Sequence, residues 1–194
     1  MRTLKWIALG VGLVVVVFLL VGFSLPRKFH VERSVVIDAP PAQVHPAVNR
    51  LKEWPTWTAW TVERFPDMKV SFAGPEEGVG ARYEWEGESI GQGELEIKTS
   101  DPAKGVTYEM AFNHGAMPST GGLTCASEGR GTKVTWYANG DLGFSPIGRF
   151  FGLSMDSMMG PDFQTGLSNL KKKVESGNAS PPNRDNSGVL SPPA

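Results

Sequence analysis

An uncharged apolar run near the N-terminus constrains the fold of this chain more than any other feature. The run WIALGVGLVVVVFLLVGFSL, from Trp6 to Leu25, is rich in Val and Leu. As a helix that rises about 1.5 Å per residue, it would be roughly 30 Å long, which matches the hydrocarbon core of a bilayer. The run therefore predicts a transmembrane helix at residues 6–25 after a short N-terminal tail at residues 1–5.

A cleaved signal peptide is the alternative interpretation of the same run. Arg2 and Lys5 form a short positive region before it, and Gly22 and Ser24 are small residues at plausible cleavage positions. Against cleavage, the run is longer than the apolar region of a signal peptide, which usually has about 7 to 15 residues. Pro26 also follows the cleavage region directly. We therefore expect an uncleaved anchor.

The flanks of the run indicate which way it would cross a membrane. Arg2 and Lys5 lie on one side and Arg27, Lys28 and Arg33 on the other, so the positive-inside count is nearly balanced. A short tail before a first hydrophobic segment is typical of a signal anchor. We therefore expect a single-pass protein of the cell membrane whose soluble domain lies outside the cytoplasm.

Length and composition favour one soluble domain after this anchor. When both ends of the 194-residue chain are set aside, about 150 residues remain, which is roughly one domain's core. The net charge is −1 and the 19 Lys and Arg residues are spread along the chain, so nucleic acid is not an expected partner. Cys125 is the single cysteine, which excludes an intramolecular disulfide and a cysteine-built metal site.

The middle of the chain consists of short segments in which apolar and polar residues alternate, separated by Gly, Pro, Asp and Lys. Alternation with period two is typical of strands that bury one face, and short connections favour antiparallel neighbours. Strands are expected within residues 29–39, 68–74, 78–87, 91–101, 105–112, 120–129 and 132–143.

Two further segments have helical spacing. Val44, Val48 and Leu51 fall at i, i+4 and i+7, and we expect this short helix to begin regularly only at Pro46 and to end at Pro55. A longer apolar stripe follows the last strand, formed by Met155, Met158, Met159, Phe163, Leu167, Leu170 and Val174. Such a stripe predicts an amphipathic helix that covers the apolar face of the sheet. Pro161 would either begin the regular part of this helix or kink it.

The C-terminal segment has a different composition. Residues 176–194 are mostly Ser, Gly, Asn and Pro, which cannot bury enough apolar surface to offset the entropy of ordering. We expect this tail to be disordered. The folded domain is then expected at residues 26–175.

In order along residues 29–175, the chain resembles a known superfamily. The segments that carry the resemblance are HVERSVVIDAPPAQV, LKEWPTWTAW, GVGARYEWEG, GTKVTWYANGDLG and MMGPDFQTGLSNLKKKVE. They look like bacterial membrane-anchored members of the START-like (SRPBCC, "polyketide cyclase/dehydrase and lipid transport") superfamily. The resemblance implies an α+β helix-grip fold, in which a curved antiparallel sheet of about six to seven strands surrounds a long C-terminal helix and encloses an apolar cavity. One departure is His45–Pro46, where relatives usually carry an aromatic residue.

A catalytic or metal site is not indicated by the sequence. His30, His45 and His114 are far apart and lack an HExxH pattern, so we expect no zinc site. Gly78–Gly80 and Gly91–Gly93 each open an alternating strand and not a helix, which favours turn formation over phosphate binding. We therefore expect no catalytic residues, no metal and no cofactor.

The aromatic and methionine residues on the inner side of the expected sheet and helix are candidates for a ligand cavity. The cavity candidates are Trp57, Trp60, Tyr83, Trp85, Tyr108, Met110, Trp136, Met155, Met159 and Phe163, and the rim candidates are Glu63 and His114. The cluster Trp54, Trp57 and Trp60 is compatible both with plain core and with a cavity wall, since aromatic side chains dominate small cores.

Three functional hypotheses follow from this pattern. The first is a membrane-anchored, non-enzymatic binding module for a hydrophobic molecule such as a lipid or an aromatic metabolite, because such pockets are mostly apolar. The second is a cyclase-like enzyme in which Tyr83, Tyr108 or His114 assists proton transfer. The third is a structural or regulatory domain whose cavity is filled by its own tryptophans.

Overall fold

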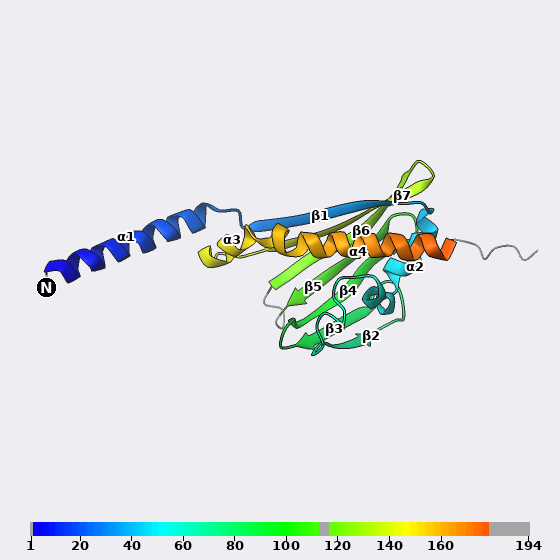
Figure 1. Ribbon diagram of the computed structural model, residues 1–194, viewed down its shortest axis with the longest axis horizontal. Helices are drawn as coiled ribbons and strands as arrows, with labels where there is room; N and C mark the ends of the chain where they lie inside the picture. The colour runs from blue at the N-terminus through cyan, green and yellow to red at the C-terminus, as the bar shows by residue number, and fades with distance from the viewer. Residues whose placement is uncertain (1, 113–116, 179–194) are drawn as a thin grey trace, which may run out of the picture.

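The computed structural model describes residues 2–112 and 117–178, and in it a long helix precedes an α+β domain (Figure 1). Helix α1 (Arg2–Ser24) extends away from the domain, and its large apolar side chains from Trp6 onward are exposed. The stretch Lys5–Ser24 is long and apolar enough to cross a membrane by length and composition, a test that N-terminal signal sequences also pass. The expected N-terminal apolar helix is therefore present.

The domain is built on one antiparallel sheet of seven strands in the order β1-β7-β6-β5-β4-β3-β2. The strands are β1 (Lys28–Ile37), β2 (Lys69–Ala73), β3 (Arg82–Gly87), β4 (Gly91–Asp101), β5 (Gly105–Phe112), β6 (Met117–Glu128) and β7 (Gly131–Asp141). Every expected strand is present. β6 begins at Met117, three residues before the expected start, because the pairing Phe112↔Met117 extends the hairpin with β5.

Glycines on the strands make room for large aromatic side chains on the inner face. Tyr108 of β5 pairs with Gly121 of β6, and a methyl group at Gly121 would lie 2.5 Å from the Tyr108 ring. Trp85 of β3 pairs with Gly93 of β4 in the same way, and a methyl group there would collide with the indole. These two pairs let aromatic rings lie flat along the sheet and not stand away from it.

Helix α4 (Met155–Asn178) lies across the inner face of the sheet and completes the helix-grip arrangement (Figure 1). Most of its stripe is buried, with Phe163, Leu167 and Leu170 no more than 1% exposed, whereas Met158, also expected in the stripe, is 52% exposed. Pro161 lies inside the helix, so the first of the two alternatives, that it begins the regular part, is wrong. Packing of the stripe outweighs the one backbone hydrogen bond that a proline removes. The helix reaches Asn178, three residues into the expected tail, and residues 179–194 lie outside the described residues.

The short helical region between β1 and β2 differs from our expectation. Helix α2 (Pro41–Asn49) begins at Pro41 and contains Pro46, so the expectation that the regular helix begins only at Pro46 is wrong. Burial of Val44 and Val48 compensates for the lost hydrogen bond at the proline. The chain is extended at Arg50 and then forms a 3₁₀ helix, η1 (Leu51–Thr56), so α2 ends well before Pro55.

One further helix, α3 (Pro146–Gly152), connects β7 to α4 and was not expected. Ser145 caps its first turn by accepting a hydrogen bond from the Gly148 amide at 3.2 Å. A helix of two turns carries too few residues to show a periodic pattern, which is why the sequence did not reveal it.

Candidate functional site

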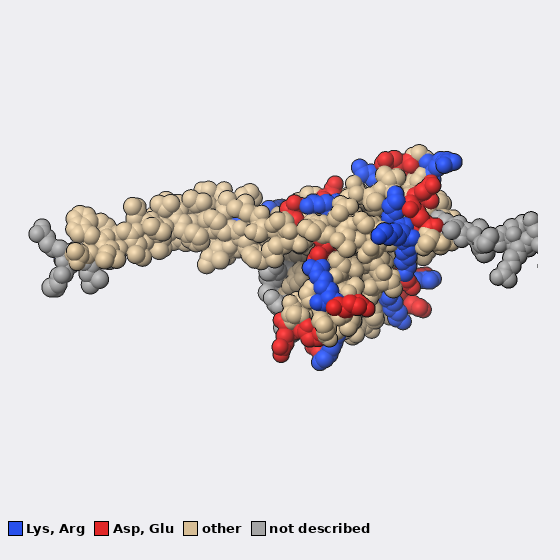
Figure 2. All heavy atoms as spheres, in the orientation of Figure 1, with Lys and Arg blue, Asp and Glu red and all other residues tan. Residues whose placement is uncertain are grey.

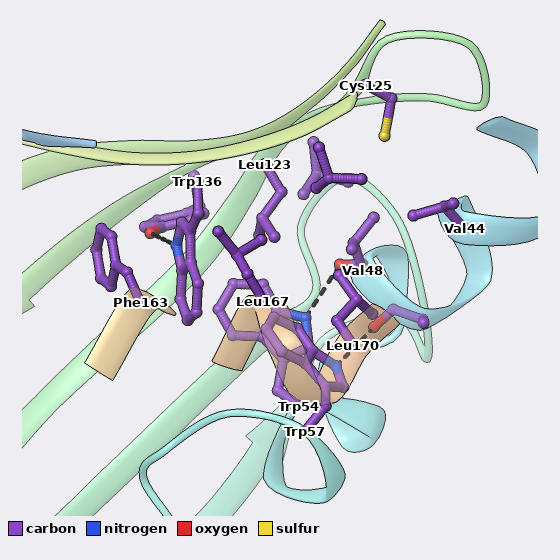
Figure 3. Packing of buried hydrophobic residues seen from close by; sticks show 14 of the residues in the cluster. Val44, Val48, Trp54, Trp57, Leu123, Cys125, Trp136, Phe163, Leu167 and Leu170 are labelled. Carbon is purple, nitrogen blue, oxygen red and sulfur yellow. Dashed lines mark hydrogen bonds between the residues drawn. The ribbon is translucent and has the colours of Figure 1, made fainter. Parts of the chain in front are cut away.

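Trp54 of η1 and Trp57, which follows η1 directly, fill the half of the domain interior that lies away from α1. A 3₁₀ helix has about three residues per turn, so the spacing Trp54–Trp57 places both rings on the same side of η1. Trp54 Nε1 donates to the Val48 carbonyl at 3.0 Å and Trp57 Nε1 to the Ala47 carbonyl at 3.1 Å (Figure 3). These bonds satisfy the buried indole groups and join η1 to α2.

We call this region the packed half. Its members are Ile37, Val44, Val48, Leu51, Trp54, Trp57, Ile97, Leu123, Leu167 and Leu170, of which Trp54 is the most exposed at 4%. Trp57 is fully buried. The packed half is therefore an ordinary close-packed core.

Trp136 of β7 marks the border of the packed half. Its ring stacks on Phe163 of α4 with centroids 4.3 Å apart and an interplanar angle of 3° (Figure 3). On its other sides it meets Trp57 at 5.3 Å and Trp60 at 5.7 Å, both edge to face. Trp136 Nε1 donates to the Tyr108 hydroxyl at 2.9 Å. Aromatic contacts and one buried hydrogen bond thus hold this ring in a single orientation.

Beyond Trp136 lies a cavity of about 270 Å³ between the sheet and the first half of α4. Its lining residues are Trp54, Thr58, Trp60, Met68, Tyr83, Trp85, Ile90, Leu95, Tyr108, Met110, Phe112, Trp136, Met158, Met159, Asp162 and Phe163. We call this region the cavity half. It includes the ends of β3 and β5, and it therefore lies at the end of the sheet from which α1 departs, because β1 starts there (Figure 1).

Few polar groups face this cavity. Burial raises the pKa of the Tyr83 and Tyr108 hydroxyls, so both stay protonated at neutral pH. The carboxylate of Asp162 accepts a hydrogen bond from Arg64 Nη1 at 2.6 Å, which forms an ion pair beside the cavity. Trp85 Nε1 is buried and has no hydrogen-bond partner within residues 2–112 and 117–178. The arrangement can accommodate an apolar molecule and donate hydrogen bonds, but its tyrosines cannot accept protons at neutral pH.

Most of the residues expected in a cavity wall lie around this one. Eight of the ten are among its lining residues: Trp60, Tyr83, Trp85, Tyr108, Met110, Trp136, Met159 and Phe163. The other two, Trp57 and Met155, are buried elsewhere and do not line it. Trp57 therefore belongs to the core, while Trp60 is part of the cavity wall, so the tryptophan cluster divides between the two interpretations.

The two residues expected at the rim have different outcomes. Glu63 is exposed and does not line the cavity, whereas its neighbour Arg64 reaches Asp162. His114 lies outside the described residues. His45, at the position where relatives usually carry an aromatic residue, bonds to Ser100 with Nε2 and Oγ 2.9 Å apart and does not line the cavity either.

Sequence reasoning missed several residues of the wall. Met68, Ile90 and Phe112 lie at strand ends or in turns and Leu95 lies within β4, and at none of them does a pattern distinguish a cavity residue from a core residue. Asp162 had a usable signal, because it follows Met158 by one helical turn and therefore lies on the same face of α4.

A larger hollow of about 970 Å³ lies on the outer face of the sheet, but its chemistry differs. Its wall is charged and mainly acidic, and Lys98 Nζ lies 3.0 Å from a Glu96 carboxylate oxygen and 3.2 Å from one of Glu109. Within residues 2–112 and 117–178, no group of three or more His, Cys, Asp and Glu side chains is arranged to hold a metal ion. The apolar cavity is therefore the candidate site.

Solved structures share this architecture at low sequence identity. A Staphylococcus aureus protein of unknown function, SA2116, is 11% identical with a TM-score of 0.59, covering 78% of this chain and 96% of its own. The protein TTHA0849 from Thermus thermophilus is 18% identical with a TM-score of 0.55, covering 77% and 99%. CV1439 from Chromobacterium violaceum is 18% identical with a TM-score of 0.50, covering 77% and 99%. At these identities the likeness shows the fold alone.

Sequence comparison identifies the family. A search of curated proteins found no match. Residues 28–175, which run from the first residue of β1 almost to the end of α4, match the family described as polyketide cyclase / dehydrase and lipid transport. Because this match covers well over half of the sequence, the chain belongs to the polyketide cyclase / dehydrase and lipid transport family.

Proposed function

We propose that this protein is a membrane-anchored binding module that holds one small hydrophobic molecule in the cavity half. The observation that carries the proposal is the cavity of about 270 Å³ lined mainly by aromatic and methionine side chains. Membership of a family that includes lipid transport supports a hydrophobic ligand. Ligand pockets are typically mostly apolar with a few polar groups, which is also the composition of this wall.

The volume of the cavity limits the size of the ligand that it can hold. Pockets for drug-sized molecules have volumes of about 300 to 1,000 Å³, so this cavity of about 270 Å³ is slightly smaller than that range. It suits a fused pair of aromatic rings or a medium-length acyl chain, and it is too small for a two-chain phospholipid. Met110 and Met159 are flexible, and flexible thioethers let a wall adjust to ligands of different shape.

The chemistry of the wall favours binding over catalysis. Tyr83 and Tyr108 were the described candidates for proton transfer, and burial raises the pKa of both. Asp162 is the acidic residue of the wall, and its carboxylate is engaged by Arg64. Tyrosine hydroxyls that stay protonated at neutral pH cannot act as general bases, and the Asp162 carboxylate is held in an ion pair with Arg64. The enzymatic hypothesis therefore has less support than the binding module.

Helix α1 would hold this module at a membrane. Its apolar side chains are exposed along the whole helix, and no charged residue lies between Trp6 and Leu25. The anchor is proposed to be uncleaved, because its apolar run is longer than that of a usual signal peptide, and the domain is proposed to lie outside the cytoplasm.

Native mass spectrometry of the full chain, gently extracted in detergent, tests the proposed ligand binding. We expect a bound apolar species of small mass, or, if the cavity is empty, uptake from a panel of naphthalene, 2-naphthol and octanoate. Binding should also change the fluorescence of Trp60, Trp85 and Trp136, which line the cavity. A protein that stays empty with every probe overturns the proposal, and conversion of a bound molecule to a product of different mass would favour the enzyme.

A further inference from the structure

The connection between β7 and α4 exposes large apolar side chains beside the end of α1. Phe144, Ile147, Phe151 and Leu153 are 74%, 69%, 48% and 62% exposed. They lie within or next to α3 (Pro146–Gly152), which adjoins α1 at the end of the domain (Figure 1). Figure 2 shows that α1 is almost uncharged on the face in view, whereas charged side chains cover much of the domain. Contiguous apolar surface of this kind marks an interaction site.

α3 is attached to α1 by several specific contacts. The rings of Phe18 and Phe150 stack with centroids 4.5 Å apart and an interplanar angle of 13°. Arg149 Nη1 donates to the Phe23 carbonyl at 2.6 Å, and so satisfies an acceptor at the C-terminal end of α1. Gly22 is buried under α3, and a methyl group there would lie 2.6 Å from Pro146 Cβ. The missing side chain at Gly22 is therefore what allows the close approach.

These contacts determine how deep α3 would lie if α1 crosses a bilayer. Phe18 precedes Ser24, the last residue of α1, by six residues, which is about 9 Å along a helix axis. Phe150 is stacked on Phe18 and must share its depth. Amphipathic helices that lie in a membrane interface bury their apolar face by about 5 to 10 Å, so the depth of Phe150 falls within that range.

Two opposite faces of α3 carry apolar side chains, and its charged residue, Arg149, is bonded to carbonyls at the end of α1. Pro146 and Phe150 face α1, whereas Ile147 and Phe151, also one turn apart, point away from it and are exposed. A helix with apolar side chains on opposite faces is normally covered on both by protein or by lipid. Since α3 is continuous with the apolar surface of α1, a lipid bilayer is the partner that fits the exposed face.

We propose that the β7–α4 connection is a membrane-interface element, which inserts Phe144, Ile147, Phe151 and Leu153 into the bilayer beside α1. The inference rests on the anchor of the proposed function. The β7–α4 connection would also fix the orientation of the domain relative to the bilayer. The end of the domain that contains the cavity half is held against the lipid surface. A hydrophobic ligand could then pass between bilayer and cavity over a short path.

Spin-label accessibility in the full chain tests this proposal. A nitroxide is attached to a cysteine at one site at a time in a Cys125→Ala background, and the protein is reconstituted in vesicles of phosphatidylethanolamine and phosphatidylglycerol. Collisions with oxygen, which concentrates in lipid, are compared with collisions with a water-soluble nickel chelate. The sites are Ile147→Cys on α3, Val15→Cys at the centre of α1, and Arg130→Cys in the turn between β6 and β7 at the other end of the sheet.

We expect the Ile147 label to lose nickel accessibility and gain oxygen accessibility, as the Val15 label does, while the Arg130 label behaves as in water. A Val15 label in lipid with an Ile147 label in water overturns the present inference and leaves the anchor intact. A Val15 label in water overturns the anchor itself. An Ile147 label shielded from both reagents overturns the inference in favour of a protein partner, such as a second copy of this chain.

A matched pair of variants in α1 sharpens the test. Gly22→Leu places a side chain against Pro146 and should push α3 away from α1, so the Ile147 label should move toward its accessibility in water. Gly12→Leu lies in the same helix with no atom within 4 Å and should leave the label unchanged. Equal readings for both variants would mean that contact with α1 does not set the depth of α3, against the proposal.

Discussion

The two halves of the domain interior are built on the same strands but differ in what covers them. In the packed half, α2 and η1 add a second layer of buried side chains, including Trp54 and Trp57, to the stripe of α4. In the cavity half, the first turns of α4 cover the sheet with Met158, Met159 and Phe163, and about 270 Å³ stays open. The position of one short helical segment, η1, therefore decides which part of the interior is packed core and which part is cavity.

The largest expected effect is on the packed half. Trp57→Ala should lower the free energy of unfolding by about 3 to 5 kcal/mol, because it removes a fully buried ring and leaves a void. Trp60→Ala should cost clearly less, since Trp60 is only partly buried and already borders open space. Urea unfolding of the full chain in detergent, followed by near-UV circular dichroism, measures both. Equal losses would contradict the division into two halves.

The second-largest expected effect concerns the anchor alone and should leave both halves of the domain interior unchanged. Val15→Arg should raise the free energy of membrane insertion by about 2.5 to 3.5 kcal/mol, because it places a charge near the centre of the apolar run. Less protein should be retained in membranes, while the near-UV spectrum of the domain stays that of the parent. Val15→Leu is the control and should be retained fully. N-terminal sequencing that finds mature protein beginning near Leu25 would show cleavage and refute the anchor.

The third effect is on the cavity half alone. Met159→Trp should fill part of the cavity and weaken binding of the probe 2-naphthol at least tenfold, which corresponds to about 1.4 kcal/mol. Its effect on the free energy of unfolding should be smaller than that of Trp57→Ala, because the new ring enters existing space. Val36→Trp adds the same ring at an exposed position and should leave binding unchanged. Unchanged binding in Met159→Trp would place the ligand elsewhere.

The smallest effect is a pH dependence that belongs to the packed half. Ser100 Oγ donates to Asn49 Oδ1 at 2.6 Å, so it accepts from His45 Nε2, which the neutral imidazole can supply. Burial lowers the pKa of His45 below its usual 6.5. The unfolded chain therefore binds the proton more readily, and stability falls as the pH drops below about 6.5 toward the folded-state pKa. His45→Gln should reduce the change in unfolding free energy between pH 7 and pH 5. If this change is the same in the variant, other groups cause the pH dependence.

Much of the fold was predictable because its pattern is local. The alternation at Tyr83 and Trp85, or the stripe through Phe163 and Leu167, follows from the period of a strand or helix and needs no tertiary information. The same alternation predicted which strand residues face inward. An inward-facing aromatic side chain must lie either in the packed core or in the wall of a cavity. The choice between these two was not predictable, as the different positions of Trp57 and Trp60 show.

The elements that escaped prediction are those in which context overrides a local rule. Pro46 and Pro161 both lie inside helices, because burial of the neighbouring apolar stripe outweighs the hydrogen bond that each proline removes. Helix α3 is too short for a periodic signal, and its contacts with α1 join residues that are distant in the chain. Arg64 and Asp162 are 98 positions apart in the chain, and no local pattern indicates that their side chains form an ion pair.

By itself the sequence determined the order of the elements, the apolar N-terminal helix and the face that each strand buries, because periodicity and turn residues act over a few neighbours. The tertiary structure alone decided that η1 fills one half of the interior and leaves the other open, and that α3 lies against α1. Both outcomes depend on where a short segment packs against residues that are distant in the chain. The physical reason is that a cavity is the volume left over after packing, and this volume is a property of all the surrounding elements together.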